Sequence, residues 1–222
     1  MKLLNDAAVI DSWSKNTGPW TVAVRSGDIE SRTLVTNQAI VDAVRSYAPS
    51  TGIDIGCGEG WLVRALDGVE MIGVDVVPGL IDVARQAGGG EFRVLSYEQI
   101  AAGTLDIAVD IAVCNFSLIG KEAVEGVFEA AGTFLKPGGH LIVQTLHPLM
   151  ACGDAPYRDG WREGSWAGFS RDFTDPPPWY FRTLDSWIGL YAGNGFRLLA
   201  VREPVHPATG KPASIILVGE MT

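Results

Sequence analysis

Short runs of apolar residues alternate with longer segments of helical spacing between residues 51 and 146. The runs predict five buried strands, at residues 52–55, 71–76, 92–95, 107–115 and 141–146. Between them apolar residues recur every three or four positions, as in 61–66 and in 124–135, where the sequence Lys136-Pro137-Gly138-Gly139 ends the helix. This alternation predicts an α/β fold whose sheet is largely parallel and covered by helices on both faces.

The segments on either side of this core have patterns of their own. Residues 1–50 contain a helix that Pro49 ends, with an apolar side made of Leu34, Ile40, Val41, Val44 and Tyr47. Thr183 is placed to cap a later helix that closes at Gly193 or Gly195. Two strands follow, at 196–201 and 214–219, and the tight turn between them predicts an antiparallel pair.

Composition removes several classes of function. The 222 residues are 47% hydrophobic and carry a net charge of −9, which disfavours a nucleic-acid partner. No apolar stretch reaches the roughly 18–20 residues of a membrane span, and Asp6 interrupts any signal-peptide core, so we expect a cytoplasmic protein that does not contact a membrane. Three widely spaced cysteines fit a reducing compartment and no zinc site.

The strongest chemical signal is the loop Asp54-Ile55-Gly56-Cys57-Gly58-Glu59-Gly60, between the first strand and a helix. Glycines there let the main chain turn sharply and approach a ligand closely, and Asp75 ends the second strand, where such folds bind a ribose. A dinucleotide fold needs a small residue where this chain has Trp61, and Asp54 would repel a pyrophosphate. The loop therefore favours a cationic adenosyl ligand without phosphate.

These motifs resemble those of the class I S-adenosylmethionine-dependent methyltransferases, in their small-molecule branch. The residues 54–60 and Gly73-Val74-Asp75 are similar to the first two motifs of that family, and Ser96-Tyr97, 110–115, 135–139 and 180–196 are similar to later ones. The resemblance implies a doubly wound, seven-stranded, mostly parallel sheet with the last strand antiparallel. It also implies S-adenosyl-L-methionine as cofactor and methyl transfer to a small molecule.

Carried onto this sequence, the resemblance implies a set of cofactor-binding residues. The methionine end would contact Asp54 and the main chain of Gly56, Cys57 and Gly58, and the ribose and adenine would contact Asp75, Val76, Ser96 and Tyr97. Asn115 and Phe116 would lie near the sulfonium. Arg32 is our candidate for the cofactor carboxylate, because a guanidinium binds a carboxylate through two parallel hydrogen bonds. The alternative for Arg32 is a surface residue or an ion pair with an acidic neighbour.

The segment 148–182 combines many glycines and three consecutive prolines with seven aromatic residues, and long insertions of this kind are commonly lids or binding loops. We expect its Trp166, Trp179 and Tyr180, together with Trp20, to bind the acceptor, although a packed lid without ligand contact is the alternative. The layout is then one domain over 1–222, with a helical cap (1–50), a cofactor-binding core (51–147), this lid (148–182) and a C-terminal helix with two strands (183–222).

His147, just past the fifth predicted strand, is the candidate general base; the alternative is a loop histidine bonded to backbone. No metal is expected. A non-catalytic adenosyl-binding module, an aminopropyl transferase and a nucleobase N-methyltransferase stay open as other functions. The last is suggested by Asp175-Pro176-Pro177-Pro178-Trp179, which does not follow an apolar strand here. The oligomeric state, monomer or homodimer, is left open.

Overall fold

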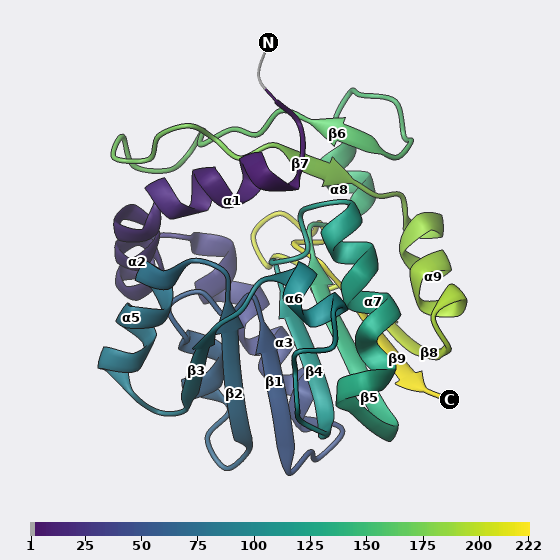
Figure 1. Cartoon of the computed structure of the whole chain (residues 1–222). Coiled ribbons are helices and arrows are strands. Elements are labelled where there is room, and N and C mark those ends of the chain that lie inside the picture. Colours follow the sequence, from purple (N-terminus) through teal and green to yellow (C-terminus); the bar gives the residue numbers. More distant parts are fainter. Residues whose placement is uncertain (1–2) are drawn as a thin grey trace.

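A seven-stranded sheet occupies the centre of the computed structural model, which describes residues 3–222 (Figure 1). The strand order is β3-β2-β1-β4-β5-β9-β8, with β1 to β5 parallel and β9 antiparallel to both of its neighbours. The predicted doubly wound sheet with an antiparallel last strand is therefore confirmed. The strands are β1 (Thr51–Ile55), β2 (Glu70–Asp75), β3 (Glu91–Val94), β4 (Val109–Asn115), β5 (Leu135–Thr145), β8 (Phe196–Arg202) and β9 (Ile215–Met221).

Helices cover both faces of this sheet and form a separate apolar core on each. One core includes residues of α6, α7 and α9, and the other includes residues of α3, α4 and α5. The helices from α3 onward are α3 (Asn37–Arg45), α4 (Trp61–Ala65), α5 (Pro78–Ala87), α6 (Tyr97–Ala101), α7 (Glu122–Phe134), α8 (Pro148–Cys152) and α9 (Leu184–Gly193).

Strand β4 explains why the central strands are continuously apolar. Its Ala112 and Cys114 belong to the first core, whereas Ile111 and Val113 belong to the second, and all four are fully buried. Side chains alternate between the two faces of a strand, so a strand covered on both faces needs apolar residues at consecutive positions.

The first fifty residues contain more helix than the pattern predicts. Helices α1 (Asp6–Lys15) and α2 (Thr17–Ser26) precede a π-helical turn, η1 (Arg32–Thr36), which continues into α3. The expectation that Leu34 lies on the apolar side is wrong, since its side chain is 53% exposed. The wider π turn shifts the phase of the helix, so residue 34 faces solvent while 40, 41 and 44 stay buried.

Helix α1 lies across the upper edge of the sheet, and the segment between the short strands β6 (Gly160–Arg162) and β7 (Trp179–Phe181) runs above it (Figure 1). These two strands pair with each other, so the segment 148–182 contains regular structure. The Asn16 side-chain amide donates to the Thr174 carbonyl oxygen at 2.7 Å and its oxygen accepts from the Thr174 N–H at 2.9 Å. An ion pair of 2.9 Å joins Lys15 to Asp175 beside them.

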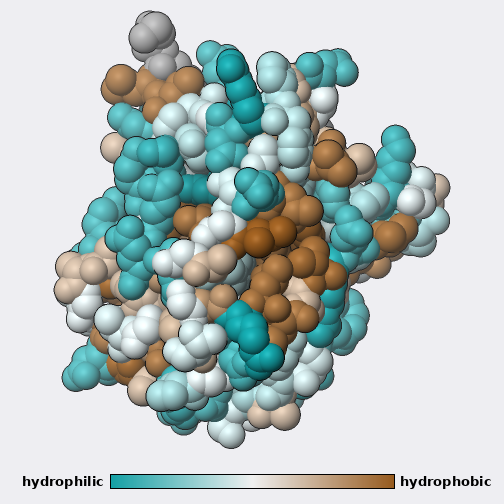
Figure 2. Space-filling view, turned by 90° about the vertical axis from the view of Figure 1, so that its right-hand side faces the viewer, coloured by the Kyte–Doolittle hydropathy of each residue, from teal (hydrophilic) through white to brown (hydrophobic). Residues whose placement is uncertain are grey.

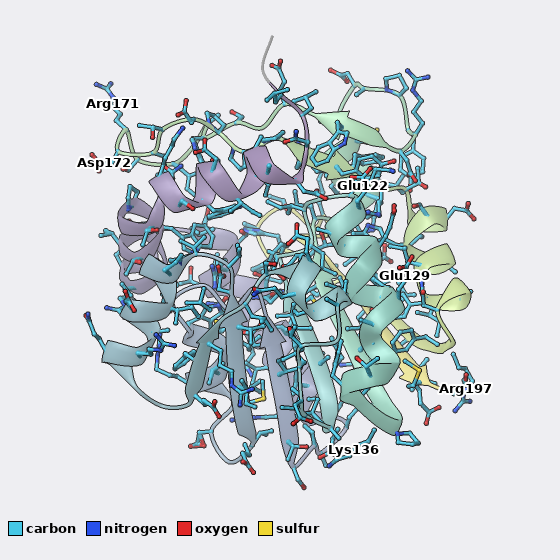
Figure 3. All side chains as sticks on the ribbon, in the orientation of Figure 1. Glu122, Glu129, Lys136, Arg171, Asp172 and Arg197 are labelled. Carbon is cyan, nitrogen blue, oxygen red and sulfur yellow. The ribbon has the colours of Figure 1, made fainter. Side chains whose placement is uncertain are left out.

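Charged side chains lie on the outside of the molecule, including Arg171 and Asp172, which are labelled in its upper part (Figure 3). Lys136, labelled at the lower end of β5 in Figure 3, pairs with Asp110 at 2.7 Å. Figure 2 shows the side that carries α9 and β8, where a hydrophobic area is bordered by hydrophilic residues. Among residues 3–222 we find no helix with the length and apolar character of a bilayer span.

Candidate active site

The loop after β1 is held in a sharp turn that only glycine accommodates at its first position. Gly56 has φ +77°, and its N–H and that of Cys57 donate to the Val74 carbonyl oxygen of the neighbouring strand, at 2.8 and 2.9 Å. A Cβ on residue 56 would lie 2.3 Å from the Cβ of Ser117, which is far inside van der Waals contact. The main chain therefore runs close beside the loop that follows β4.

Asp75, at the end of β2, fastens this turn from the other side. One carboxylate oxygen accepts from the Gly58 N–H at 2.9 Å and the other accepts from the Val77 N–H at 2.9 Å. Burial raises the pKa of Asp75, and its hydrogen bonds to main-chain N–H groups oppose that rise. The carboxylate is thus oriented at the upper edge of the sheet and retains lone pairs for further donors.

Asp54 is the most unusual charge in the molecule. Its side chain is 2% exposed and its Oδ1 atom has no hydrogen-bond partner. Burial and, to a smaller extent, the nearby Asp75 raise the pKa of Asp54 to about 8, although Arg32 acts to lower it. A buried carboxylate without a partner is costly, so this position favours a ligand that supplies a cation or a proton.

Arg32 presents the complementary unsatisfied group. Its guanidinium lies over the rings of Trp20 and Trp61, with 5.4 and 5.0 Å between the guanidinium carbon and the ring centroids, and Nε donates to Asn37 at 3.2 Å. Its Nη2 atom is buried without a partner, and burial lowers the pKa of Arg32 to about 10. The π turn η1 places this residue, as π turns commonly do at functional sites. Arg32 is buried, so the structure contradicts the alternative that placed it at the surface.

These two unsatisfied groups do not neutralise each other. Among residues 3–222 no ion pair within 4.0 Å joins Arg32 to Asp54, although each influences the pKa of the other. Glu59 nearby is already paired, with Arg64 at 2.6 Å and Arg25 at 3.0 Å. The pair therefore leaves a buried carboxyl group and a buried guanidinium available to one ligand that carries an ammonium and a carboxylate.

A cavity opens above the glycine loop, below α1. Eight of the predicted residues line it, and they are Trp20, Gly56, Gly58, Asp75, Val76, Tyr97, Asn115 and Phe116. Sequence reasoning missed the residues that α1 and the loops contribute, chiefly Asp6, Val9, Ile10, Trp13, Glu98, Ser117 and Ile119. The helical spacing of Val9, Ile10 and Trp13 is the signal that could have found the first of these.

Four predicted cofactor residues lie outside the lining of this cavity, and they are Arg32, which lines the aromatic cavity described below, Asp54, Ser96 and Cys57. The Ser96 hydroxyl accepts from the Gln99 N–H at 3.2 Å and forms a capping box at the start of α6. Cys57 is 4% exposed and packs in the core between the sheet and α3, α4 and α5. The Tyr97 hydroxyl, by contrast, reaches over the turn and donates to the Ser117 carbonyl oxygen at 3.1 Å.

Asn115, at the tip of β4, is oriented by a side chain that sequence reasoning missed. The amide nitrogen of Gln144 donates to the Asn115 Oδ1 atom at 2.8 Å and to the Thr36 carbonyl oxygen at 3.0 Å. Gln144 is 1% exposed, so these bonds are protected from water. One buried amide therefore links the end of β4 to the π turn that carries Arg32.

A second cavity adjoins the first and is dominated by aromatic rings. Its lining includes the predicted acceptor residues Trp20, Trp166, Trp179 and Tyr180, the predicted cofactor residues Arg32 and Phe116, and four further rings, from Trp13, Phe169, Phe181 and Trp187. Trp13, Trp20, Phe116 and Ile119 line both cavities. Phe116 has φ +54°, a strained conformation for a non-glycine residue and one that is typical of functional sites.

His147 lies beside this aromatic cavity but outside its lining. Its ring is 4% exposed, Nε2 is 2.6 Å from Glu203, and Nδ1 is buried without a partner. The residues before and after it, Leu146 and Pro148, do line the cavity. The ring of His147 therefore contacts a side chain, that of Glu203 in the segment after β8, and not the main chain.

The chain was compared with known proteins on three levels. A family model described as a methyltransferase domain matches residues 53–143. Ubiquinone biosynthesis O-methyltransferases are 30% identical over 128 residues in Cupriavidus pinatubonensis (53% of this chain, 51% of the relative) and 30% identical over 125 residues in Xylella fastidiosa (52% and 50%). The chain spans about half the length of these curated relatives.

Solved structures share the fold over most of the chain. Magnesium protoporphyrin IX methyltransferase from Synechocystis, with bound S-adenosylhomocysteine, has a TM-score of 0.68 at 16% identity and covers 98% of this chain and 100% of its own. A Burkholderia thailandensis 1,6-didemethyltoxoflavin-N1-methyltransferase has a TM-score of 0.65 at 13% identity, covering 94% and 88%. A Mesorhizobium loti S-adenosylmethionine-dependent methyltransferase has a TM-score of 0.61 at 22% identity, covering 81% and 96%.

Proposed function

We propose that the chain is a class I S-adenosylmethionine-dependent methyltransferase that methylates a small, planar and largely apolar acceptor, a proposal supported by the methyltransferase-domain model over residues 53–143 and by the shared fold. The observation that carries this proposal is the pair of buried, unsatisfied charges. Asp54 offers a carboxylate oxygen and Arg32 a guanidinium nitrogen, both without partners. The amino-acid end of the cofactor has an ammonium for the first and a carboxylate for the second.

The other residues of the first cavity fit the remaining parts of S-adenosylmethionine. Asp75 faces the position of a ribose, whose hydroxyls would donate to its free lone pairs. Val76 and Leu80 supply an apolar wall for the adenine, and the Tyr97 main-chain N–H, in the first turn of α6, is free of intrahelical partners. We propose that Ser96 and Cys57 contact the cofactor through their main chain, because their side chains make other contacts.

When bound, the cofactor supplies a methyl group on a sulfonium, whose departure leaves a neutral thioether. The protein then has to align the acceptor lone pair with that methyl group and exclude water. The aromatic rings of the second cavity provide flat, apolar surfaces for alignment. Helix α1 contributes to the lining of both cavities and is joined through Asn16 to Thr174 in the loop above it, so we propose that these two segments limit the access of water.

We propose His147 as the group that accepts the acceptor's proton. Its Nε2 atom is held by Glu203 at 2.6 Å, which leaves Nδ1 as the basic atom, and that atom is buried without a partner next to the cavity. For the variant His147→Gln we expect the rate of methyl transfer to fall at least tenfold. An unchanged rate in that variant would leave alignment of the acceptor as the whole mechanism.

Cofactor binding is tested by thermal shift and calorimetry with S-adenosylmethionine, S-adenosylhomocysteine and NAD. We expect the first two to raise the melting temperature and NAD to leave it unchanged. Formation of S-adenosylhomocysteine with a panel of aromatic acceptors then tests catalysis. Binding without turnover of any acceptor would favour the non-catalytic module, and stabilisation by NAD alone would overturn the proposal.

A further inference from the structure

The aromatic cavity contains two buried cations and no anion. Arg32 and Arg182 both line it, and among the described residues its lining has no aspartate, glutamate or histidine. The remaining lining is aromatic, aliphatic or hydroxyl-bearing. The local potential is therefore positive in a region of low dielectric, where charges interact strongly.

Arg182 follows directly after β7 and its position is fixed on several sides. Its side chain is 3% exposed, and its guanidinium carbon lies 4.8 Å from the ring centroid of Tyr180 and 5.3 Å from that of Trp187. Nη1 donates to the Gly120 carbonyl oxygen at 2.7 Å and Nη2 to that of Lys121 at 3.1 Å. The guanidinium is thereby held rigidly without using all of its donors.

The charge of Arg182 is incompletely balanced. Its ion-pair partner, Glu125, is 3.6 Å away and 38% exposed, so water weakens the attraction. The Nε–H group of Arg182 donates to no acceptor among residues 3–222. A rigid, buried cation with an unused donor on a cavity wall is suited to an anionic ligand group.

We propose that Arg182 recognises an anionic group on the acceptor, so that the preferred acceptor is a planar aromatic anion. This inference rests on the proposed function, in which the carboxylate of the cofactor occupies Arg32 and leaves Arg182 as the cation facing the acceptor. The aromatic rings contact the flat part of the molecule and the guanidinium binds its anionic oxygen. An ammonium-bearing acceptor would be repelled by the same charge.

Binding of two isosteric probes, 2-naphthoate and 2-naphthamide, separates charge recognition from stacking. Calorimetry and tryptophan fluorescence are measured on the full chain saturated with S-adenosylhomocysteine. A charge-assisted hydrogen bond contributes about 1.5–3 kcal/mol, so we expect the anion to bind at least about tenfold more tightly. Arg182→Gln is expected to reduce this ratio below about twofold, and Arg182→Lys to give an intermediate value.

Arg162→Gln is the matched control, because Arg162 also lies over an aromatic ring of β7, that of Phe181 at 3.6 Å, but lines neither cavity. It should retain the full preference for the anion. Equal binding of the two probes to the natural protein, binding of neither, or an unchanged ratio in Arg182→Gln would overturn the inference. If Arg182→Gln fails to fold, the ratio in the natural protein and in Arg182→Lys decides it. Failure of S-adenosylhomocysteine to bind would refute the proposed function itself.

Discussion

The unsatisfied carboxylate of Asp54 makes cofactor binding depend on pH. With a pKa of about 8 in the empty protein, Asp54 is mostly protonated at pH 7, whereas an ammonium group needs the ionised form. The ionised fraction rises from about one in a hundred at pH 6 to about one half at pH 8, so affinity for S-adenosylhomocysteine should increase about 50-fold over that range. At pH 6 to 7, binding should release close to one proton.

Calorimetry in two buffers of different ionisation enthalpy measures both the affinity and the proton release. Asp54→Asn should abolish the pH dependence and weaken binding at pH 8 by roughly 10- to 100-fold, because a charge-assisted hydrogen bond is lost. 5′-Methylthioadenosine, which lacks the amino-acid end, should bind both proteins equally and without pH dependence. An affinity of the natural protein for S-adenosylhomocysteine that is constant within twofold from pH 6 to 8 would refute the reasoning.

The same pKa predicts an opposite effect on the stability of the empty protein. The pKa of Asp54 is raised on folding, from 3.8 to about 8, so its contribution to stability is complete below pH 4 and is lost as the pH rises through 8. At pH 7 the loss is at most about 4 kcal/mol, and recovery of even 1 kcal/mol raises Tm by about 2–4 °C. Empty Asp54→Asn should therefore melt above the natural protein at pH 8. Asp110→Asn is the control, because Lys136 lowers the pKa of Asp110, and it should melt lower.

Three further predictions concern the site and its cover. Arg32→Gln should weaken S-adenosylhomocysteine at least tenfold by calorimetry and leave 5′-methylthioadenosine unchanged, since only the former has a carboxylate; equal losses would indicate a structural role. Gly56→Ala should cost at least about 3 kcal/mol in denaturant unfolding, whereas Gly68→Ala, with φ +87° but open space around it, should cost about 1 kcal/mol. Asn16→Ala should expose residues 163–178 to limited proteolysis, because it removes both bonds to Thr174, whereas Ser170→Ala at the exposed end of that loop should not.

The sheet was predictable from sequence because its determinants are local. Each buried strand is an apolar run, and the turn at Gly56 carries its own signal in residue type. Asp54 and Asp75 could be placed together because parallel neighbouring strands end at one edge. These features need only the periodicity of the strands and the order in which they pair.

The segments above the site, α1 and the loop between β6 and β7, are held by contacts between residues far apart in the sequence, which no local pattern predicts. Asn16 and Thr174 are 158 residues apart, and neither residue type indicates a partner. Helix α2 contains Gly18 and Pro19, which weaken its helical signal, and the strands β6 and β7 have three residues each, too few to show a period of two. The π turn that positions Arg32 is not indicated by hydrophobic periodicity, so burial of the guanidinium was not predicted from the sequence.

The two cavities are lined by different kinds of residue, and the residues that line both indicate where the methyl group would be transferred. The first has Asp75 and the main chain of the glycine loop, whereas the second has nine aromatic rings and two arginines. A group that moves between ligands in the two cavities has to cross where both are lined by the same residues, which are Trp13, Trp20, Phe116 and Ile119. Phe116 is the one member of this wall with a strained backbone, and it directly follows Asn115, whose amide Gln144 holds in place. The strain at Phe116 is therefore expected to serve orientation at the point of transfer, and relieving it by Phe116→Gly should lower the rate of methyl transfer more than it lowers the affinity for either ligand.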